Sequence, residues 1–99
     1  MRLLFLSIAL FISTISFAQQ TVTGTVSDES GETIPGATIL EINTSNGVVT
    51  DIDGNFSISV ANSDAILRVS FLGFESQEIT VGARSVVDII LAQDLQELE

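Results

Sequence analysis

The feature that constrains the fold most strongly is a turn that leads directly into a strictly alternating segment. The turn contains Asp51, Asp53, Gly54 and Asn55, residue types that favour local hydrogen bonds and positive φ angles. In the segment 56–60 every second residue is apolar, and serines fill the positions between. This period of two predicts a half-buried strand whose apolar face lies on a core.

The same period recurs along the chain, between turn-forming residues that are spaced about ten positions apart. In segment 37–43 the inward face stays open, because Ala37 and Ile39 point to one side while Leu40 and Ile42 point to the other. No segment has a helical period, and short strands at this spacing are typical of an all-β sandwich or barrel. The predicted strands are residues 21–27, 37–43, 48–50, 55–60, 66–71, 74–81 and 86–92.

The first eighteen residues predict a secretory signal peptide. Arg2 supplies a positive charge, residues 3–12 are almost wholly apolar, and Ala18 ends a Ser-Phe-Ala cleavage pattern. The apolar run is shorter than the roughly 20 residues that a transmembrane helix needs, which favours cleavage after Ala18 over a retained anchor. We therefore expect an exported protein with one domain, which starts at residue 19.

Composition excludes several classes of function. Thirteen Asp and Glu residues stand against three Lys and Arg, so the chain lacks the clustered positive charge that nucleic acids and anionic membrane surfaces require. The absence of Cys excludes disulfides, thiolate zinc sites and a lipid-modified N-terminal Cys. The chain also contains no His, so the commonest catalytic bases and nucleophiles are missing and we expect no enzyme activity.

A calcium site is the alternative to a plain turn at Asp51, Asp53 and Asn55, because hard oxygen ligands suit this cation. An EF-hand loop requires Gly at its sixth position and Glu at its twelfth. Counted from Asp51, these positions hold Phe56 and Asn62. The sequence therefore favours a structural turn, and it predicts neither a metal ion nor another cofactor.

Binding to another protein is the remaining class of function, and three surface residues are candidates for the contact. Leu72 points away from the inward-facing Phe71, which makes Leu72 the better contact residue. Arg68 and Arg84 are the only basic residues after residue 18, and each is expected to pair with a surface carboxylate. An edge strand is a further candidate, because its unpaired N–H and C=O groups can accept a strand from a partner.

Four motifs in register carry a resemblance to a known family. The motifs are Val-Thr-Gly-Thr-Val-Ser-Asp at 22–28, Gly-Glu-Thr-Ile-Pro-Gly-Ala-Thr at 31–38, Thr-Asp-Ile-Asp-Gly-Asn-Phe at 50–56 and Val-Ser-Phe-Leu-Gly-Phe-Glu at 69–75. With these motifs the chain resembles the carboxypeptidase-like regulatory domain over residues 20–92. This resemblance implies a prealbumin-like fold, which is a seven-stranded antiparallel Greek-key β-sandwich, over residues 19–92.

In Bacteroidota this domain commonly follows a signal peptide at the N-terminus of SusC-like TonB-dependent outer-membrane transporters. The resemblance implies a non-catalytic periplasmic accessory or interaction domain of such a transporter, present here as a fragment or truncated form, with protein partners in the cell envelope. Residues 93–99 resemble the start of the linker that leads to the TonB box. Association with the outer membrane would then come only from regions beyond residue 99.

Two alternatives to the transporter domain stay open. The first is a free-standing secreted β-sandwich that binds a partner, and the second is an accessory domain of a secreted zinc carboxypeptidase. Both share the fold that the resemblance implies, and they differ in the part of the protein that would come after the domain.

Overall fold

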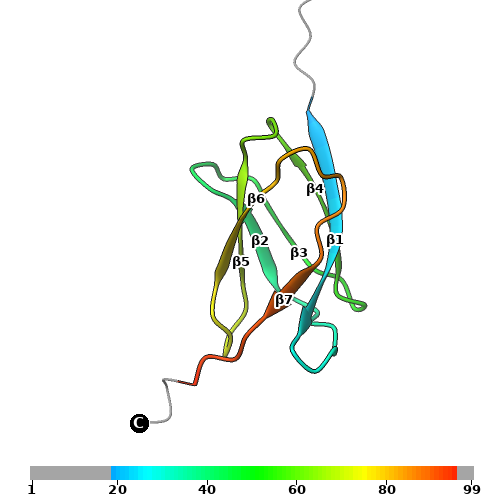
Figure 1. The fold of residues 1–99 in the computed structure, drawn as a ribbon, viewed down its shortest axis with the longest axis vertical. Coiled ribbons are helices and arrows are strands. Elements are labelled where there is room, and N and C mark those ends of the chain that lie inside the picture. Colours follow the sequence, from blue (N-terminus) through cyan, green and yellow to red (C-terminus); the bar gives the residue numbers. More distant parts are fainter. Residues whose placement is uncertain (1–18, 96–99) are drawn as a thin grey trace, which may run out of the picture.

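The computed structural model describes residues 19–95 (Figure 1). The predicted signal peptide at residues 1–18 lies outside the described residues, as does the end of the predicted linker. The described part contains seven strands and no helix, and therefore no helix that could cross a membrane. The strands are β1 (Gln20–Asp28), β2 (Thr38–Glu41), β3 (Gly47–Val49), β4 (Asn55–Val60), β5 (Ile66–Ser70), β6 (Gln77–Thr80) and β7 (Ile89–Leu91).

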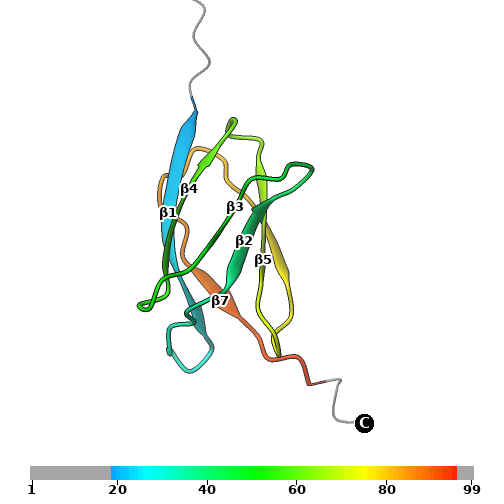
Figure 2. The same ribbon diagram turned by 180° about the vertical axis from the view of Figure 1, so that it is seen from behind.

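The strands form two sheets that enclose one core. The three-stranded sheet has the order β4-β1-β7, and the four-stranded sheet has the order β3-β2-β5-β6. Figures 1 and 2 show the two sheets on opposite sides of the molecule. The prediction of an all-β sandwich with seven strands is thus confirmed, whereas the Greek-key description of the connections stays a prediction.

The expectation that all strands pair antiparallel is wrong at one place. β1 pairs with β4 in antiparallel orientation but with β7 in parallel orientation, with Val26 opposite Ile89 and Asp28 opposite Leu91. The reason lies in the path of the chain. No hairpin joins the first strand to the last, so their relative direction is set by the connection after β6, which crosses between the sheets and then runs alongside β1.

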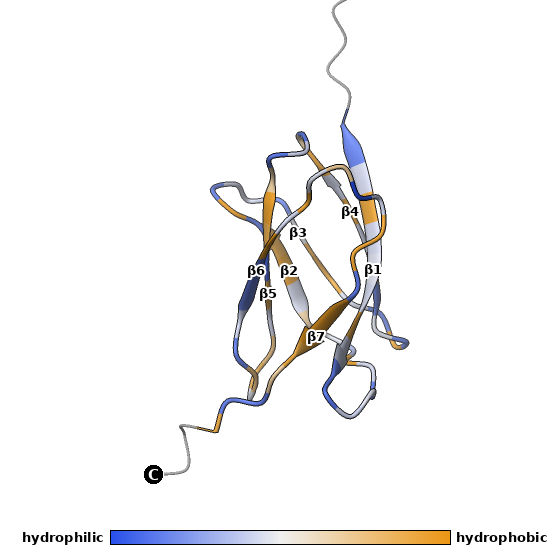
Figure 3. Ribbon diagram, in the orientation of Figure 1, coloured by the Kyte–Doolittle hydropathy of each residue, from blue (hydrophilic) through white to orange (hydrophobic). Residues whose placement is uncertain are grey.

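Alternate residues of the strands supply the core. On β2 the buried side chains are Ile39 and Glu41, the latter unexpectedly for a charged residue. The inward face of this segment is therefore the one that contains Ala37 and Ile39. β7 is hydrophobic along its whole length although Ile90 faces outward, whereas β6 is largely hydrophilic (Figure 3). The buried apolar residues are Val22, Val26, Ile34, Ala37, Ile39, Phe56, Ile58, Val60, Leu67, Val69, Val81, Val87, Ile89 and Leu91.

Gly24 lets the chain pack tightly at the centre of β1. A Cβ atom at this position would lie 1.8 Å from the carbonyl oxygen of Val87, a distance that no pair of non-bonded atoms tolerates. The backbone hydrogen bonds of Thr23 to Ser85 and Val87, at 2.9 and 2.8 Å, hold the segment before β7 against β1 at this point. The missing side chain therefore allows the last segment to close over the first strand.

Candidate functional site

The predicted turn at residues 51–55 is organised by the Asp51 carboxylate. Its Oδ1 atom accepts hydrogen bonds from the backbone N–H groups of Asp53 and Asn55, both at 2.9 Å. The Asp51 carbonyl accepts the N–H of Gly54 at 2.9 Å, and Gly54 has a φ angle of 80°. This is the arrangement of an Asx turn, in which a side-chain oxygen takes the place of a backbone acceptor.

A second loop, between β1 and β2, repeats this construction. Oδ1 of Asp28 accepts the N–H groups of Ser30 at 2.9 Å and of Glu32 at 3.0 Å. The Asp28 carbonyl accepts the N–H of Gly31 at 3.0 Å, and Gly31 has a φ angle of 93°. The sequences Asp-Glu-Ser-Gly-Glu and Asp-Ile-Asp-Gly-Asn are therefore two versions of one loop.

Both loops lie at the same end of the sandwich. The first follows β1 and the second precedes β4, and these two strands pair antiparallel. The N–H of Val26 donates to the Gly54 carbonyl at 2.9 Å, which extends the pairing into the second loop. The β5–β6 loop and the segment after β7 reach the same end, at the bottom of Figure 1.

The segment after β7 is hydrogen-bonded to the β5–β6 loop. Phe74 and Gln93 form an antiparallel bridge. The N–H of Glu75 donates to the Ala92 carbonyl at 2.8 Å, and the N–H of Asp94 donates to the Gly73 carbonyl at 2.9 Å. The last described residues therefore connect the end of one sheet to a loop of the other.

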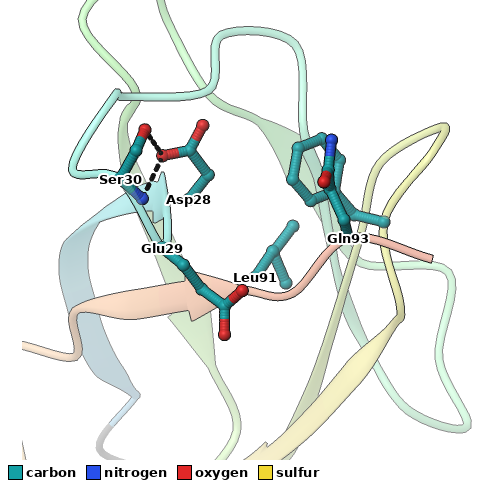
Figure 4. Close-up of a pocket in the computed structure, with 6 residues that line it drawn as sticks. Asp28, Glu29, Ser30, Leu91 and Gln93 are labelled. Atoms are coloured by element: carbon teal, nitrogen blue, oxygen red, sulfur yellow. Dashed lines mark hydrogen bonds between the residues drawn. The ribbon is translucent and has the colours of Figure 1, made fainter. Parts of the chain in front are cut away.

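A cleft with a volume of about 300 Å³ opens at this end, between the Asp28 loop and the segment after β7. Its lining is mixed, with carboxylate, hydroxyl and amide groups beside an aromatic ring and an aliphatic side chain. Figure 4 shows Leu91 between the Asp28 loop on one side and Gln93 on the other. The lining residues are Asp28, Glu29, Ser30, Phe74, Leu91 and Gln93.

Hydrogen bonding makes Asp28 a stronger acid than usual. The bond from the Ser30 hydroxyl, at 2.6 Å, lowers the pKa of the Asp28 carboxyl below its ordinary value of 3.8, and the N–H groups of Glu32, Ser30 and Gly31 lower it further. Such bonds stabilise the charged form of the carboxyl group. At neutral pH the wall of the cleft therefore carries a negative charge.

The predicted contact residues do not lie together. Leu72 is 92% exposed in the β5–β6 loop, as expected. The expectation that Phe71 faces inward is wrong, since its side chain is 37% exposed. β5 ends at Ser70, so the alternation of the strand stops before Phe71, whose ring instead lies 6.1 Å from that of Phe74.

The two arginines differ in their partners. Nη2 of Arg68 lies 2.7 Å from Oε2 of Glu78, so the expected pairing with a surface carboxylate is confirmed there. Arg84 departs from the expectation, because its guanidinium donates to the backbone carbonyls of Val81 and Thr80. The turn after β6 folds the Arg84 side chain back over the end of that strand, where these carbonyls accept it.

Side-chain amides bridge the outer edges of the two sheets. Nδ2 of Asn46, which lies directly before β3, donates to the Ser59 carbonyl of β4 at 2.6 Å and to Oε1 of Glu41 at 3.0 Å. On the opposite side Nε2 of Gln77 on β6 donates to the Ile90 carbonyl of β7. These amides cap carbonyl groups that an incoming strand would otherwise use.

Sequence reasoning did not identify the cleft or the buried Glu41. Asp28 of the cleft does carry a readable signal, because its spacing from Gly31 repeats that of Asp51 from Gly54. Phe74 and Gln93 carry none, since only the tertiary fold brings them together.

The arrangement at this end provides a cleft for a ligand. Within residues 19–95, no three His, Cys, Asp or Glu side chains come together in a way that could hold a metal ion. The cleft pairs charged oxygen atoms with an apolar floor, which suits a ligand that is itself part charged and part apolar.

Comparisons with known proteins identify relatives of one kind. The family model of the CarboxypepD_reg-like domain matches residues 22–99. The TonB-dependent receptor SusC of Bacteroides thetaiotaomicron is 42% identical over 98 residues, which are 98% of this chain and 10% of the receptor. The TonB-dependent receptor P3 of Formosa agariphila is 40% identical over 97 residues, or 97% of this chain and 10% of the receptor. The chain spans 8–10% of the length of the curated relatives that it matches.

Among solved structures, a chain of a type II cohesin–X–dockerin complex from Acetivibrio cellulolyticus has a similar fold. The TM-score is 0.64 and the identity is 21%, and the match covers 75% of this chain and 58% of that one. At this level of identity the likeness concerns the fold alone, and it agrees with the two-sheet architecture.

Proposed function

The chain belongs to the CarboxypepD_reg-like domain family, and from this membership we propose that it serves as a non-catalytic accessory domain of a SusC-like TonB-dependent outer-membrane transporter. In this proposal the domain is exported by its signal peptide, lies in the periplasm and contacts protein partners of the cell envelope. The sequence is then one part of a longer receptor, or a truncated form of it.

One observation carries this proposal. The match to the receptor SusC covers 98% of the chain at 42% identity but only 10% of the receptor. A likeness of this level over nearly the whole chain favours descent from the same part of such a receptor, and it favours that context over a secreted peptidase.

Features of the fold support a role in binding. The end that carries the two Asp loops exposes large apolar side chains, among them Ile52 at 84%, Leu72 at 92% and Leu95 at 65%. Exposed apolar groups beside polar ones are typical of protein contact sites. We therefore place the partner contact at this end.

Strand addition is a second mode of contact within the same proposal, and β6 offers the edge for it. The N–H of Val81 donates to the Ala65 carbonyl at 2.9 Å, and in an antiparallel pair such bonded positions recur at every second residue. The backbone groups of Glu78 and Thr80 therefore point away from β5. The Thr80 carbonyl accepts the Arg84 side chain, which leaves the Glu78 groups and the Thr80 N–H for an added strand.

Cell fractionation tests the proposed function. An antibody raised against residues 19–99 would be used to immunoblot soluble and outer-membrane fractions of cells that carry the natural gene. We expect one band in the outer-membrane fraction, far larger than a 99-residue protein. A small band in the soluble periplasmic fraction would contradict the proposal and favour a free-standing binding module.

A further inference from the structure

The cleft beside Asp28 combines an apolar floor with a charged wall. Leu91 is fully buried and lies at the base, while Phe74 is partly buried and packs against the core. Asp28 and Glu29 line the opposite side with their carboxylates, as Figure 4 shows. A ligand that fills this space needs an apolar part for the floor and a polar or charged end for the wall.

The two carboxylates retain unused acceptor atoms. All three hydrogen bonds to the Asp28 carboxylate reach Oδ1, and none reaches Oδ2. Glu29 makes no side-chain hydrogen bond or ion pair within the described part of the chain. Oδ2 of Asp28 and the two oxygens of Glu29 together offer about six acceptor sites that are not in use, so the wall can accept further donors.

No positive charge of the described chain neutralises this wall. Arg68 is paired with Glu78, and Arg84 is bonded to backbone carbonyls at the end of β6. The chain as a whole has a formal net charge of −10. The cleft therefore attracts a cation that comes from another molecule.

The shape selects among cations. A bare metal ion would gain nothing from the apolar floor, and within residues 19–95 no group of three or more His, Cys, Asp or Glu side chains could hold one. Lysine and arginine side chains, by contrast, bury an aliphatic stem while their charged head stays near water or an acceptor. Phe74 offers such a head or stem an aromatic surface, which adds a favourable contact.

We propose that the Asp28–Phe74 cleft binds a lysine or arginine side chain of a partner protein, with the stem on Phe74 and the cation near the carboxylates of Asp28 and Glu29. This rests on the proposed function, because it specifies where the envelope partner contacts the domain and by which chemistry. The exposed Leu72, in the same loop as Phe74, extends the contact around the cleft.

An NMR titration tests the cleft directly. The purified ¹⁵N-labelled protein would be titrated with N-acetyl-lysine methylamide into the millimolar range, and the amide signals of Ser30 and Gln93 would be followed. We expect saturable shifts of both signals. N-acetyl-norleucine methylamide, which has an uncharged aliphatic side chain, should give no saturable shift at the same concentrations.

Two matched variants separate a local contact from general attraction. Glu29→Gln removes a charge from the cleft and should raise the dissociation constant about threefold, as expected for one exposed ion pair. Glu32→Gln removes a charge from the same loop but outside the cleft lining, so it should leave the dissociation constant unchanged. The proposal is overturned if the lysine compound gives no saturable shift, if both compounds bind equally, or if the two variants behave alike.

The outcome does not depend on the transporter context. The titration uses this chain alone, whereas the fractionation experiment asks which larger protein contains it. Saturable shifts in the titration together with a small soluble band in the fractionation would support the cleft proposal and contradict the transporter proposal. No saturable shift together with a large outer-membrane band would contradict the cleft proposal and support the transporter proposal.

Discussion

At the scale of single residues, Asp28 and Asp51 perform the same task in two loops. Each carboxylate accepts backbone N–H groups two and four residues ahead, and a glycine with positive φ closes each loop. The loops differ in their surroundings, because Asp28 borders the cleft whereas the Asp51 loop packs against β1. Because of this difference, the same substitution can be compared in the two loops, with one loop as the control for the other.

The two loop glycines should differ in how well they tolerate alanine. In Gly54→Ala the new Cβ would lie 2.8 Å from Cβ of Thr33 and 2.9 Å from the Val26 carbonyl oxygen, whereas in Gly31→Ala it would meet nothing within 4 Å. Both variants carry backbone strain of about 1–3 kcal/mol, so the close contacts should make Gly54→Ala lose at least about 1 kcal/mol more than Gly31→Ala in urea unfolding. Equal losses would contradict this packing.

The acidity of Asp28 should depend on the Ser30 hydroxyl. We expect the Asp28 carboxyl to titrate below pH 3.8, and Ser30→Ala should move its pKa upward, because the Ser30 side chain is the largest cause of the shift. A lowered pKa stabilises the folded state fully above pH 3.8, and this contribution is lost as the pH falls through the pKa of the folded state. Carboxyl ¹³C shifts of the two proteins measure both values, and an unchanged pKa in the variant would be evidence against this cause.

At the scale of elements, the amide of Asn46 ties β3 and β4 together at one edge. Asn46→Ala would remove its bonds to Glu41, which is only 7% exposed, and to the Ser59 carbonyl. Glu41 would keep only the Ala61 N–H, at 3.4 Å from Oε2. Leaving Oε1 of this buried carboxylate without a partner should lower the free energy of unfolding by roughly 1–3 kcal/mol. Urea unfolding gives the value.

The matched control for this change is Asn62→Ala. The Asn62 side chain accepts the N–H of Asp64, at 2.9 Å, in an exposed turn, so its removal should lower the free energy of unfolding by no more than about 1 kcal/mol. If the two alanine variants lost the same stability, the Asn46 bridge would not have the role assigned to it.

The inward face of β2 can be tested in the same way. Ile39 is fully buried, whereas Leu40 is only partly so. Ile39→Ala should therefore lower the free energy of unfolding by about 2–5 kcal/mol, and Leu40→Ala by clearly less. The opposite order would mean that the strand presents its other face to the core.

Much of the fold can be predicted from the sequence at this scale, but not all of it. The alternation from Asn55 to Val60 predicts β4 and its buried face correctly. In β2 both faces carry apolar residues, so the choice between them comes from pairing with β3 and β5. The parallel pairing of β7 with β1 depends on the path of the chain between the sheets, which no local pattern encodes.

The candidate site was less accessible from the sequence than the fold. Arg68 lies as its position in the alternation of β5 predicts, and Leu72 is exposed as expected although the strand ends before it. The cleft depends on the contact between Phe74 and Gln93, which are far apart along the chain and carry no distinguishing motif. Local patterns therefore predict which residues are exposed, but not which exposed residues come together.

At the scale of the whole molecule, the described chain starts and leaves at opposite ends of the sandwich. β1 begins at the top of Figure 1, and the segment after β7 runs out at the bottom, beside the cleft. In the proposed transporter, the cleft end would thus be the end nearest to the rest of the receptor. A partner bound there would contact the domain close to its junction with the receptor.

Labelling of a single introduced cysteine tests the central proposal most directly. These 99 residues contain no Cys, and Val86→Cys would place a thiol at a position that is 58% exposed and lies outside the proposed contact. Cells that carry the natural gene with this change would be treated with a membrane-impermeant maleimide before and after the outer membrane is permeabilised, with the unchanged gene as background. We expect a label that appears only after permeabilisation, on a large outer-membrane protein. Labelling of intact cells, or of a small soluble protein, would contradict it.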